Sequence, residues 1–287
     1  MIKPLRHVLI AAMSLALVTN LAAHSHAQDG AAPRSAAEVA AELANPNTVL
    51  GTMNFNYDAT WFDGDLPGAG DQSGNTMSFQ PVLPYPVGSN VNFFLRPLIP
   101  LVFDRPVPAA DGFDNVGLNL GDITVDSAVG VTMGSGLVLV GGLVMSMPTA
   151  TDNRISLDQW LLGPEAMVAL VKPWCAVGLL VTQSWDIAGE DSYSTNITAG
   201  QYFVVINLGS GWQLRSSPPY TYNHKAASGQ RWTIPVGGGV NRTMILGKTP
   251  WKFGIEYWKY VSAPDAFGAD YQVRITVAPV VPLPWGG

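Results

Sequence analysis

The sequence predicts an all-β protein: a closed antiparallel up-and-down transmembrane β-barrel of about 12 strands, within a range of about 10–14, preceded by a short N-terminal helix. Three observations predict it: side chains that alternate with period two, frequent turn residues and a low content of charge. Hydrophobic residues make up 47% of the chain and charged residues 13%, against about 25% charged in soluble domains. A lipid-facing surface or a very large core must therefore cover the apolar side chains.

The first residues have the pattern of an export signal. Lys3 and Arg6 precede an apolar run over 8–23, and the small-residue sequence Ser25-His26-Ala27 follows it. This order of positive, apolar and small residues is typical of a secretory signal peptide. We therefore expect residues 1–27 to be a signal peptide, 28–47 a leader with a short helix, and 48–287 the barrel domain.

One helix is expected in the leader. Ser35 and Glu38 have the spacing of a helix capping box, in which the side chain of each residue accepts a hydrogen bond from the free backbone N–H of the other. Alanine-rich sequence continues to Ala44, and Asn45-Pro46 ends it. The helix is therefore expected to be about ten residues long.

From residue 49 onward the pattern is that of strands. Phe55, Tyr57 and Trp61 alternate with polar residues, as Phe253, Ile255 and Tyr257 do near the C-terminus, which gives each strand one apolar and one polar face. Turn-rich separators delimit the expected strands, which join antiparallel neighbours. These strands cover residues 49–62, 75–85, 90–104, 121–133, 136–148, 161–172, 174–186, 195–208, 211–225, 230–246, 249–260 and 270–281.

The length of these strands favours a barrel in a membrane over a soluble β-sandwich. Several reach the length of about ten residues that a tilted strand needs to cross a bilayer, and only a closed sheet pairs every backbone group in lipid. Aromatic residues lie near strand ends, as in the interfacial girdles of such barrels. They are Trp61, Tyr85, Trp160, Trp174, Trp185, Trp212, Trp232, Trp251 and Trp258.

Short motifs, through their order and spacing along the chain, give it a resemblance to a known family. They include Gln80-Pro81-Val82-Leu83-Pro84, Arg96-Pro97-Leu98-Ile99-Pro100 and Trp232-Thr233-Ile234-Pro235-Val236-Gly237-Gly238-Gly239-Val240. The sequence resembles bacterial outer-membrane β-barrels described as transporter-like or phenol-degradation MetA-pathway-like, and often labelled neuromedin U-like. The resemblance implies an outer-membrane location and passage of small molecules, and it carries no catalytic residues.

On the strand pattern, the polar rows face a lumen. Charges that interrupt apolar strands must point inward, because an Arg at mid-depth in lipid costs about 2–4 kcal/mol. Two interpretations remain open: a charge-lined pore or ligand site, and a set of ion pairs that fills a narrow barrel. The candidate lumen-lining residues are Asn54, Asn56, Asp58, Arg96, Asp122, Glu165, Arg215, Glu256 and Arg274.

Other chemistry has weak support in the sequence. His224 near Ser216, Ser217 or Ser228 is the one candidate catalytic pair after the signal peptide, and no Gly-x-Ser-x-Gly elbow accompanies it. Three aspartates in the turn over 63–71 lack the pattern of a calcium loop, and the glycine run at 237–239 indicates close strand packing. We therefore expect no enzyme, cofactor or metal site. A net charge of −6 without a basic cluster disfavours nucleic acid.

The function expected from the sequence is an outer-membrane channel or transporter for small solutes, hydrophobic or aromatic compounds among them. The partners are outer-membrane lipid, an unidentified solute and, during biogenesis, the barrel-assembly machinery. Two alternatives remain: a non-conducting structural or interaction barrel, and a secreted soluble β-sandwich that binds a ligand.

Overall fold

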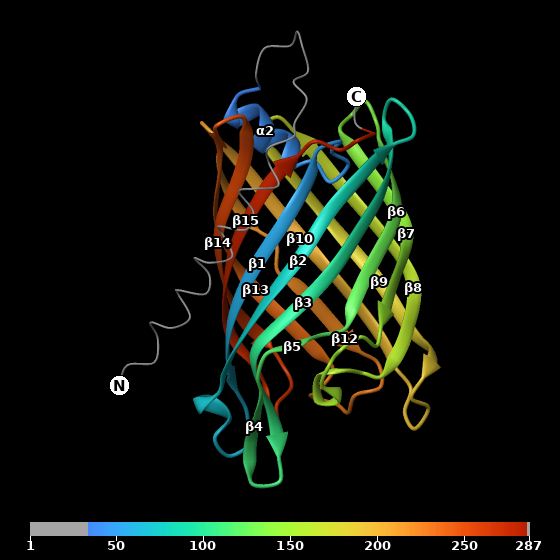
Figure 1. Cartoon of the computed structure of the whole chain (residues 1–287), viewed down its shortest axis with the longest axis vertical. Helices are drawn as coiled ribbons and strands as arrows, with labels where there is room; N and C mark the ends of the chain where they lie inside the picture. Colours follow the sequence, from blue (N-terminus) through green and yellow to red (C-terminus); the bar gives the residue numbers. More distant parts are fainter. Residues whose placement is uncertain (1–33, 286–287) are drawn as a thin grey trace. The chain divides into compact units, whose positions relative to one another are not determined.

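The computed structural model describes residues 34–285, of which 35 onward form one compact unit. Its centre is a closed antiparallel β-barrel (Figure 1), as the sequence predicts. The expected signal peptide lies outside the described residues. No helix of the described part is long and apolar enough to cross a membrane.

The described elements follow one another along the chain in a simple order. They are α2 (Ala36–Leu43), β1 (Gly51–Asp63), η2 (Ala69–Asp71), β2 (Ser73–Pro86), β3 (Val91–Ala109), β4 (Gly112–Val116), β5 (Asn119–Leu120), β6 (Ile123–Thr132), β7 (Leu137–Met147), η3 (Asn153–Ile155), β8 (Gln159–Lys172), β9 (Cys175–Gly189), β10 (Asn196–Gly209), β11 (Trp212–Ser216), β12 (Pro219–Asn223), β13 (Trp232–Leu246), β14 (Thr249–Ser262) and β15 (Gly268–Val281).

Each barrel strand pairs with its neighbours in sequence, and the last pairs with the first. From β1 the order is β2, β3, β6, β7, β8, β9, β10, β11 with β12, β13, β14 and β15, and β15 returns to β1 through a register that runs from Gly51–Val281 to Asp63–Gly268. The short strands β4 and β5 pair with β3 and are not barrel strands of their own. Counting β11 and β12 as one gives twelve barrel strands, which confirms the prediction. The closed sheet contradicts the β-sandwich alternative.

The helix α2 forms where the capping box predicts it. Its first turn is capped by Ser35, whose hydroxyl accepts from the Glu38 amide at 3.2 Å, while the Ser35 amide donates to the Glu38 carboxylate at 2.7 Å. The helix has 8 residues, fewer than the expected ten or so. Its C-cap is Ala44, two residues before Pro46, and the Ala44 N–H donates to the Ala40 carbonyl.

Prolines explain where the ladders are interrupted. Pairing of β2 with β3 stops between Phe79–Ile99 and Leu83–Leu95, a segment that contains Pro81 and Pro97, which have no N–H to donate. The single strand expected over 211–225 is divided into β11 and β12 at Ser217-Pro218. In contrast, β3 runs on to Ala109 and pairs with β4, beyond the expected end at 104.

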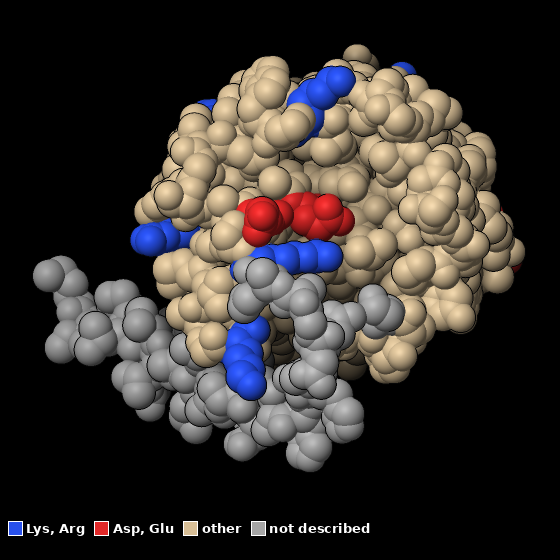
Figure 2. Space-filling view, turned by 90° about the horizontal axis from the view of Figure 1, so that it is seen from above, with Lys and Arg blue, Asp and Glu red and all other residues tan. Residues whose placement is uncertain are grey.

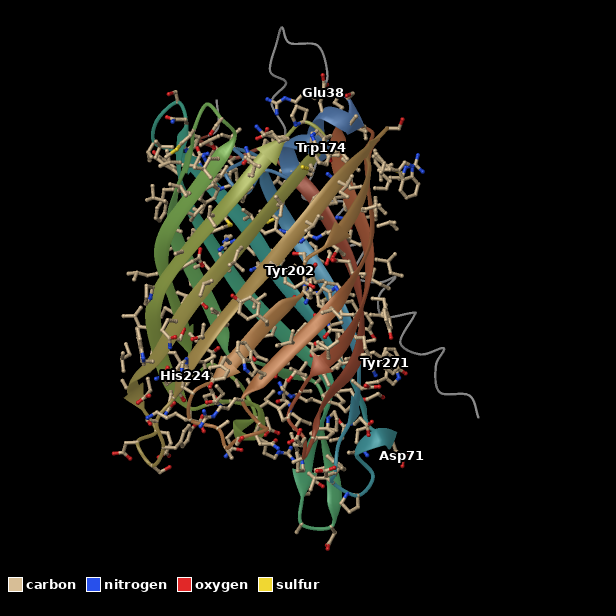
Figure 3. The ribbon with its side chains drawn as sticks, turned by 180° about the vertical axis from the view of Figure 1, so that it is seen from behind. Glu38, Asp71, Trp174, Tyr202, His224 and Tyr271 are labelled. Carbon is tan, nitrogen blue, oxygen red and sulfur yellow. The ribbon has the colours of Figure 1, made fainter. Side chains whose placement is uncertain are left out.

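The two ends of the barrel differ in their connections. At one end lie α2 and tight turns such as 173–174, 210–211 and 247–248; at the other lie long loops, among them 64–72, 148–158 and 224–231. Figure 3 shows Glu38 and Trp174 at the helix end and Asp71 and His224 at the opposite end. We call these the short-turn end and the long-loop end.

The outer surface of the barrel is apolar and exposed. Leu143 is 53% exposed, Ile255 50% and Val168 47%, which is an unusual position for such side chains in water. Exposed tryptophans lie toward both ends of this band, as predicted for aromatic girdles: Trp160, Trp185 and Trp232 near the long-loop end, and Trp174 and Trp212 near the short-turn end. Trp258 is different, because it is fully buried and packs inward.

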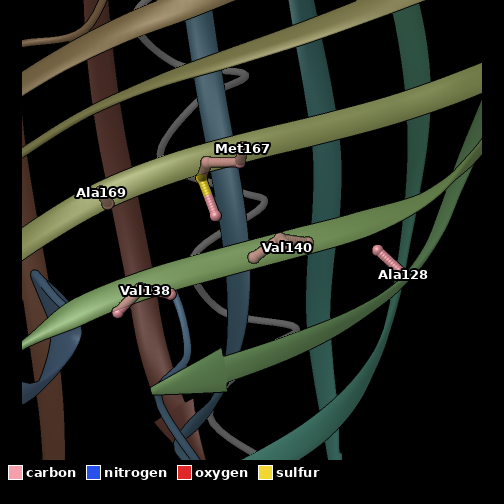
Figure 4. Packing of buried hydrophobic residues seen from close by; sticks show 5 residues of the cluster. All are labelled: Ala128, Val138, Val140, Met167 and Ala169. Atoms are coloured by element: carbon pink, nitrogen blue, oxygen red, sulfur yellow. The ribbon is translucent and has the colours of Figure 1, made fainter. Parts of the chain in front are cut away.

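Inside the barrel, a compact apolar cluster covers one part of the wall. Ala128 on β6, Val138 and Val140 on β7, and Met167 and Ala169 on β8 are buried together (Figure 4). These strands therefore present apolar side chains to the interior as well as to the outside. Their sequences show little alternation for this reason.

Substitution of Gly163 on β8 tests how tightly the wall is packed. A Cβ there would lie 1.6 Å from the Gln183 carbonyl oxygen of β9, so Gly163→Ala is expected to destabilise the barrel by about 1–3 kcal/mol or more. The measurement is the urea midpoint of heat-modifiable gel migration. Gly141→Ala is the matched control, since a Cβ there meets nothing within 4 Å; equal midpoints for the two variants would contradict the packing.

Candidate functional site

The barrel encloses a cavity of about 230 Å³ that extends from the leader into the lumen. We call it the lumen cavity. Seven of the nine residues predicted from the sequence to face the lumen line it: Asn54, Asn56, Arg96, Glu165, Arg215, Glu256 and Arg274. The strand period places them there, because alternate residues of each strand share one face.

The other two predicted residues occupy different places. Asp58 faces the interior and forms an ion pair with Arg274. Asp122 lies before β6, where its carboxylate accepts hydrogen bonds from the amides of Thr149, Ala150 and Leu157. Asp122 therefore anchors the long loop 148–158 and does not line the lumen cavity.

The Asp58–Arg274 pair lies across the seam where the barrel closes. The two residues are directly opposite each other on β1 and β15, and the guanidinium donates to both carboxylate oxygens at 2.7 Å each. The Arg274 guanidinium also lies 4.7 Å from the centre of the buried Trp258 ring. A bidentate pair of this kind is stronger and more directional than a single contact.

A second charged group comes from strands β3, β6 and β8. Arg96 of β3 donates to Glu165 of β8 at 2.9 Å and lies 3.1 Å from Asp126 of β6. The Glu165 side chain is fully buried, which is costly for a carboxylate without a partner. Because Arg96 faces two carboxylates, this group carries a formal charge of −1.

A third group has the opposite sign. Arg215 of β11 lies 3.4 Å from Glu256 of β14, and it donates to Ser217 at 3.1 Å. Lys252 is buried on β14 and lines the same cavity. Two basic residues and one carboxylate give a formal charge of +1, opposite the negative group.

Several buried polar atoms of these groups have no hydrogen-bond partner among the described residues. They are the Nε atoms of Arg96 and Arg215, Oε2 of Glu165 and Oε1 of Glu256. Unsatisfied buried polar atoms cost free energy and are uncommon in folded proteins. Their concentration around one cavity marks it as a site where water or a polar solute is favoured.

The wall of the lumen cavity is divided into two faces, which the sequence reading did not anticipate. Strands β6 to β10 contribute mostly apolar side chains, and β11 to β15 with β1 contribute mostly polar ones. Continuous apolar runs in the sequence, such as Leu137–Met147, indicate which strands form the apolar face. The apolar face is lined by Ala128, Val140, Met167, Leu180, Phe203 and Val205.

The leader crosses the mouth of the barrel at the short-turn end. In its helix α2, the Ala40 carbonyl accepts from Gln213 of β11 at 2.8 Å. At its end, the Asn47 side chain donates to Thr132 of β6 at 2.7 Å, and Asn92 of β3 donates to the Asn47 carbonyl at 2.9 Å. Strands β3 and β11 are six positions apart in a twelve-strand barrel. The leader therefore bridges opposite sides of the mouth.

Leader residues also form one end of the lumen cavity. Leu43, Ala44, Asn45 and Pro46 line it, as does Thr48, which follows the leader. Viewed from the short-turn end, acidic side chains lie beside a basic one near the middle of the face, and further basic side chains lie nearer its rim (Figure 2). The leader thus narrows the lumen at this end.

The remaining sequence candidates have ordinary structural places. His224 shares a hydrogen bond of 2.8 Å with the Thr198 hydroxyl and lies edge-on to Tyr222. The glycine run at 237–239 is a close contact with β14, since a Cβ on Gly239 would lie 1.8 Å from the Ile255 carbonyl oxygen. Cys175 is buried. The residues described in the structure contain no group of three or more His, Cys, Asp or Glu that could hold a metal ion.

Comparison with solved structures identifies the fold as one shared with outer-membrane channels. An outer membrane channel from Pseudomonas putida superposes with a TM-score of 0.63 at 13% identity, covering 90% of this chain and 100% of that one. The NanC porin superposes with a TM-score of 0.50 at 8% identity, covering 80% of this chain and 100% of the porin. At these identities the likeness establishes the fold.

Comparison of sequences adds no family. No protein-family model matches the chain, and no curated protein is similar enough to be matched. The resemblance to transporter-like, MetA-pathway-like barrels therefore stays a prediction.

The seam pair predicts a measurable contribution to stability. Asp58→Asn leaves the Arg274 guanidinium without its carboxylate, so we expect a loss of about 1–3 kcal/mol in the free energy of unfolding. The measurement is urea unfolding of the protein in detergent. Lys259→Gln is the control, because it removes an exposed ion pair with Asp270 and should leave stability unchanged. An equally small effect of both substitutions would show that the seam pair is dispensable.

Proposed function

We propose that the protein is an outer-membrane β-barrel that passes small solutes through its lumen. The single observation that carries this proposal is the lumen cavity, which is lined by charged groups with unsatisfied atoms inside a closed barrel. Fold alone does not fix function, so we infer the function from the composition of this cavity and of the surface around it.

The outer surface supports a location in the outer membrane. An exposed apolar band with aromatic residues toward both ends is the surface that a lipid bilayer covers. Barrels in bacterial outer membranes have short turns on the periplasmic side and longer loops on the outside. We therefore assign the short-turn end with the leader to the periplasm, and the long-loop end to the exterior.

The two faces of the lumen cavity indicate the class of solute. One face offers aliphatic side chains and Phe203, and the other offers amides and charges. A solute with an apolar body and a polar group satisfies both faces at once, whereas a fully hydrated solute leaves the apolar face uncovered. We propose small amphipathic compounds, including aromatic ones, as the solutes. Contact with the barrel-assembly machinery during biogenesis stays a prediction.

A non-conducting barrel is the competing candidate, and the leader is the observation that favours it. The leader crosses the mouth and forms one end of the cavity. The two functions differ in conductance, since a blocked lumen gives no channel steps in a planar bilayer. The following two experiments separate them.

Charge substitutions in the lumen should change ion selectivity in opposite directions. Arg96→Ala leaves Asp126 and Glu165 uncompensated and should favour cations, while Glu256→Ala leaves Arg215 and Lys252 uncompensated and should favour anions. We expect a change of about twofold or more in the ratio of cation to anion permeability. The measurement is the reversal potential of single channels in a salt gradient.

Lys259→Gln is the control for these substitutions. It removes a positive charge, as Arg96→Ala does, but from an exposed pair outside the lumen cavity. Its reversal potential should match that of the unaltered protein. Absence of channel steps in the unaltered protein and in all three variants would reject the conducting function and leave the non-conducting one.

Release of the leader should widen the path. Asn47→Ala removes the hydrogen bond to Thr132 and one of the contacts with Asn92, so the leader is held less firmly on that side of the mouth. We expect higher single-channel conductance and more frequent transitions between levels. The measurement is the same planar-bilayer recording.

Asn119→Ala is the matched control for the leader. Asn119 lies at the long-loop end, where it donates to the Gly117 carbonyl, so its removal should leave conductance unchanged. An unchanged conductance of Asn47→Ala would show that this end of the leader does not limit the path.

A further inference from the structure

A second cavity of about 570 Å³ lies at the long-loop end, apart from the lumen cavity. We call it the outer-mouth cavity. Its volume is within the range of about 300–1,000 Å³ that is usual for small-molecule sites. The ends of β1, β3 and β13 and the connection between β14 and β15 surround it.

The lining of the outer-mouth cavity is mainly apolar and aromatic. Phe62 and Phe267 are stacked with their ring centres 4.8 Å apart, and Phe113 lies against Phe267 at 4.6 Å. Pro106, Pro108 and Pro264 contribute further rigid apolar surface. Among the described residues, no Asp or Glu lines the cavity. A flat apolar group is therefore the body that this lining accommodates.

Two arginines provide the charge, and only one of them is already paired. The Arg154 guanidinium lies 2.6 Å from Asp152 and 3.6 Å from Asp114. Its side-chain and backbone hydrogen bonds lower the pKa of the Asp152 carboxyl to about 2. Arg154 is therefore occupied by protein carboxylates.

Arg105 is the other arginine, and it is exposed. Its side chain forms no hydrogen bond or ion pair with any residue in the range that the structure describes. The backbone that carries it is held by pairing of Arg105 with Val116 across β3 and β4. Five donors in a planar arrangement are thus available on a fixed hairpin beside the phenylalanines.

We propose that the outer-mouth cavity binds a small organic anion with a flat apolar body, such as an aromatic carboxylate. The carboxylate accepts hydrogen bonds from the Arg105 guanidinium, and the ring packs against Phe62 and Phe267. Charge-assisted bidentate contacts of this type are specific for planar anions. The site lies at the end that we assign to the exterior, and binding there does not require the lumen to conduct.

The experiment is a titration of the full-length protein in lipid nanodiscs with a fluorine-labelled benzoate, followed by fluorine NMR. We expect saturable binding to the unaltered protein and weakening by about tenfold or more in Arg105→Gln. The neutral benzyl alcohol of the same ring should bind more weakly than the benzoate to the unaltered protein. It should not distinguish that protein from Arg105→Gln.

Arg231→Gln is the matched control, because Arg231 is an exposed arginine of the long-loop end that does not line the outer-mouth cavity. It should bind the benzoate as the unaltered protein does, and heat-modifiable migration of each variant verifies folding. Equal affinity of Arg105→Gln and the unaltered protein would overturn the proposal. So would absence of saturable benzoate binding, or equal affinity for the benzoate and the alcohol.

Discussion

Pairing of β15 with β1 is the interaction on which the rest of this molecule depends. In the bilayer where we propose that the barrel lies, no water satisfies free N–H and C=O groups at a sheet edge, so the last strand must return to the first. Once the sheet is closed, alternate residues of every strand face either the outside or the lumen. The seam also brings Asp58 opposite Arg274, so the backbone closure and a bidentate ion pair occur at the same place.

The charged side chains that face the lumen are balanced against one another. Four basic and four acidic side chains face it, and their formal charges cancel. They are distributed unevenly, however: the Arg96 group is negative and the Arg215 group is positive, on different parts of the wall. An uneven distribution produces a field across the lumen even when the total charge is zero. A dipolar solute is oriented by such a field, while its long-range attraction to the barrel stays weak.

Some features were readable in the sequence because they depend on neighbours along the chain. The strand period, the capping box at Ser35 and the turn residues are local, and they gave the twelve-strand barrel and the helix. The division of the lumen into two faces was missed, because continuous apolar runs such as β7 do not reveal which side chains point inward. Asp122 was misplaced for a related reason: its partners in 148–158 are distant in sequence. The unpaired state of the Arg105 side chain depends on segments distant in sequence that meet at the outer-mouth cavity. No local sequence pattern encodes their arrangement.

The position of the leader across the mouth affects the stiffness of the barrel. Its contacts with Gln213 at one end and with Asn92 and Thr132 at the other join opposite sides of the wall. A segment attached to opposite sides of a barrel resists deformation of its circular cross-section into an ellipse. The leader therefore stiffens the barrel where it crosses the mouth. Both sets of contacts exist together only after the sheet has closed. Complete docking of the leader therefore requires the closed barrel.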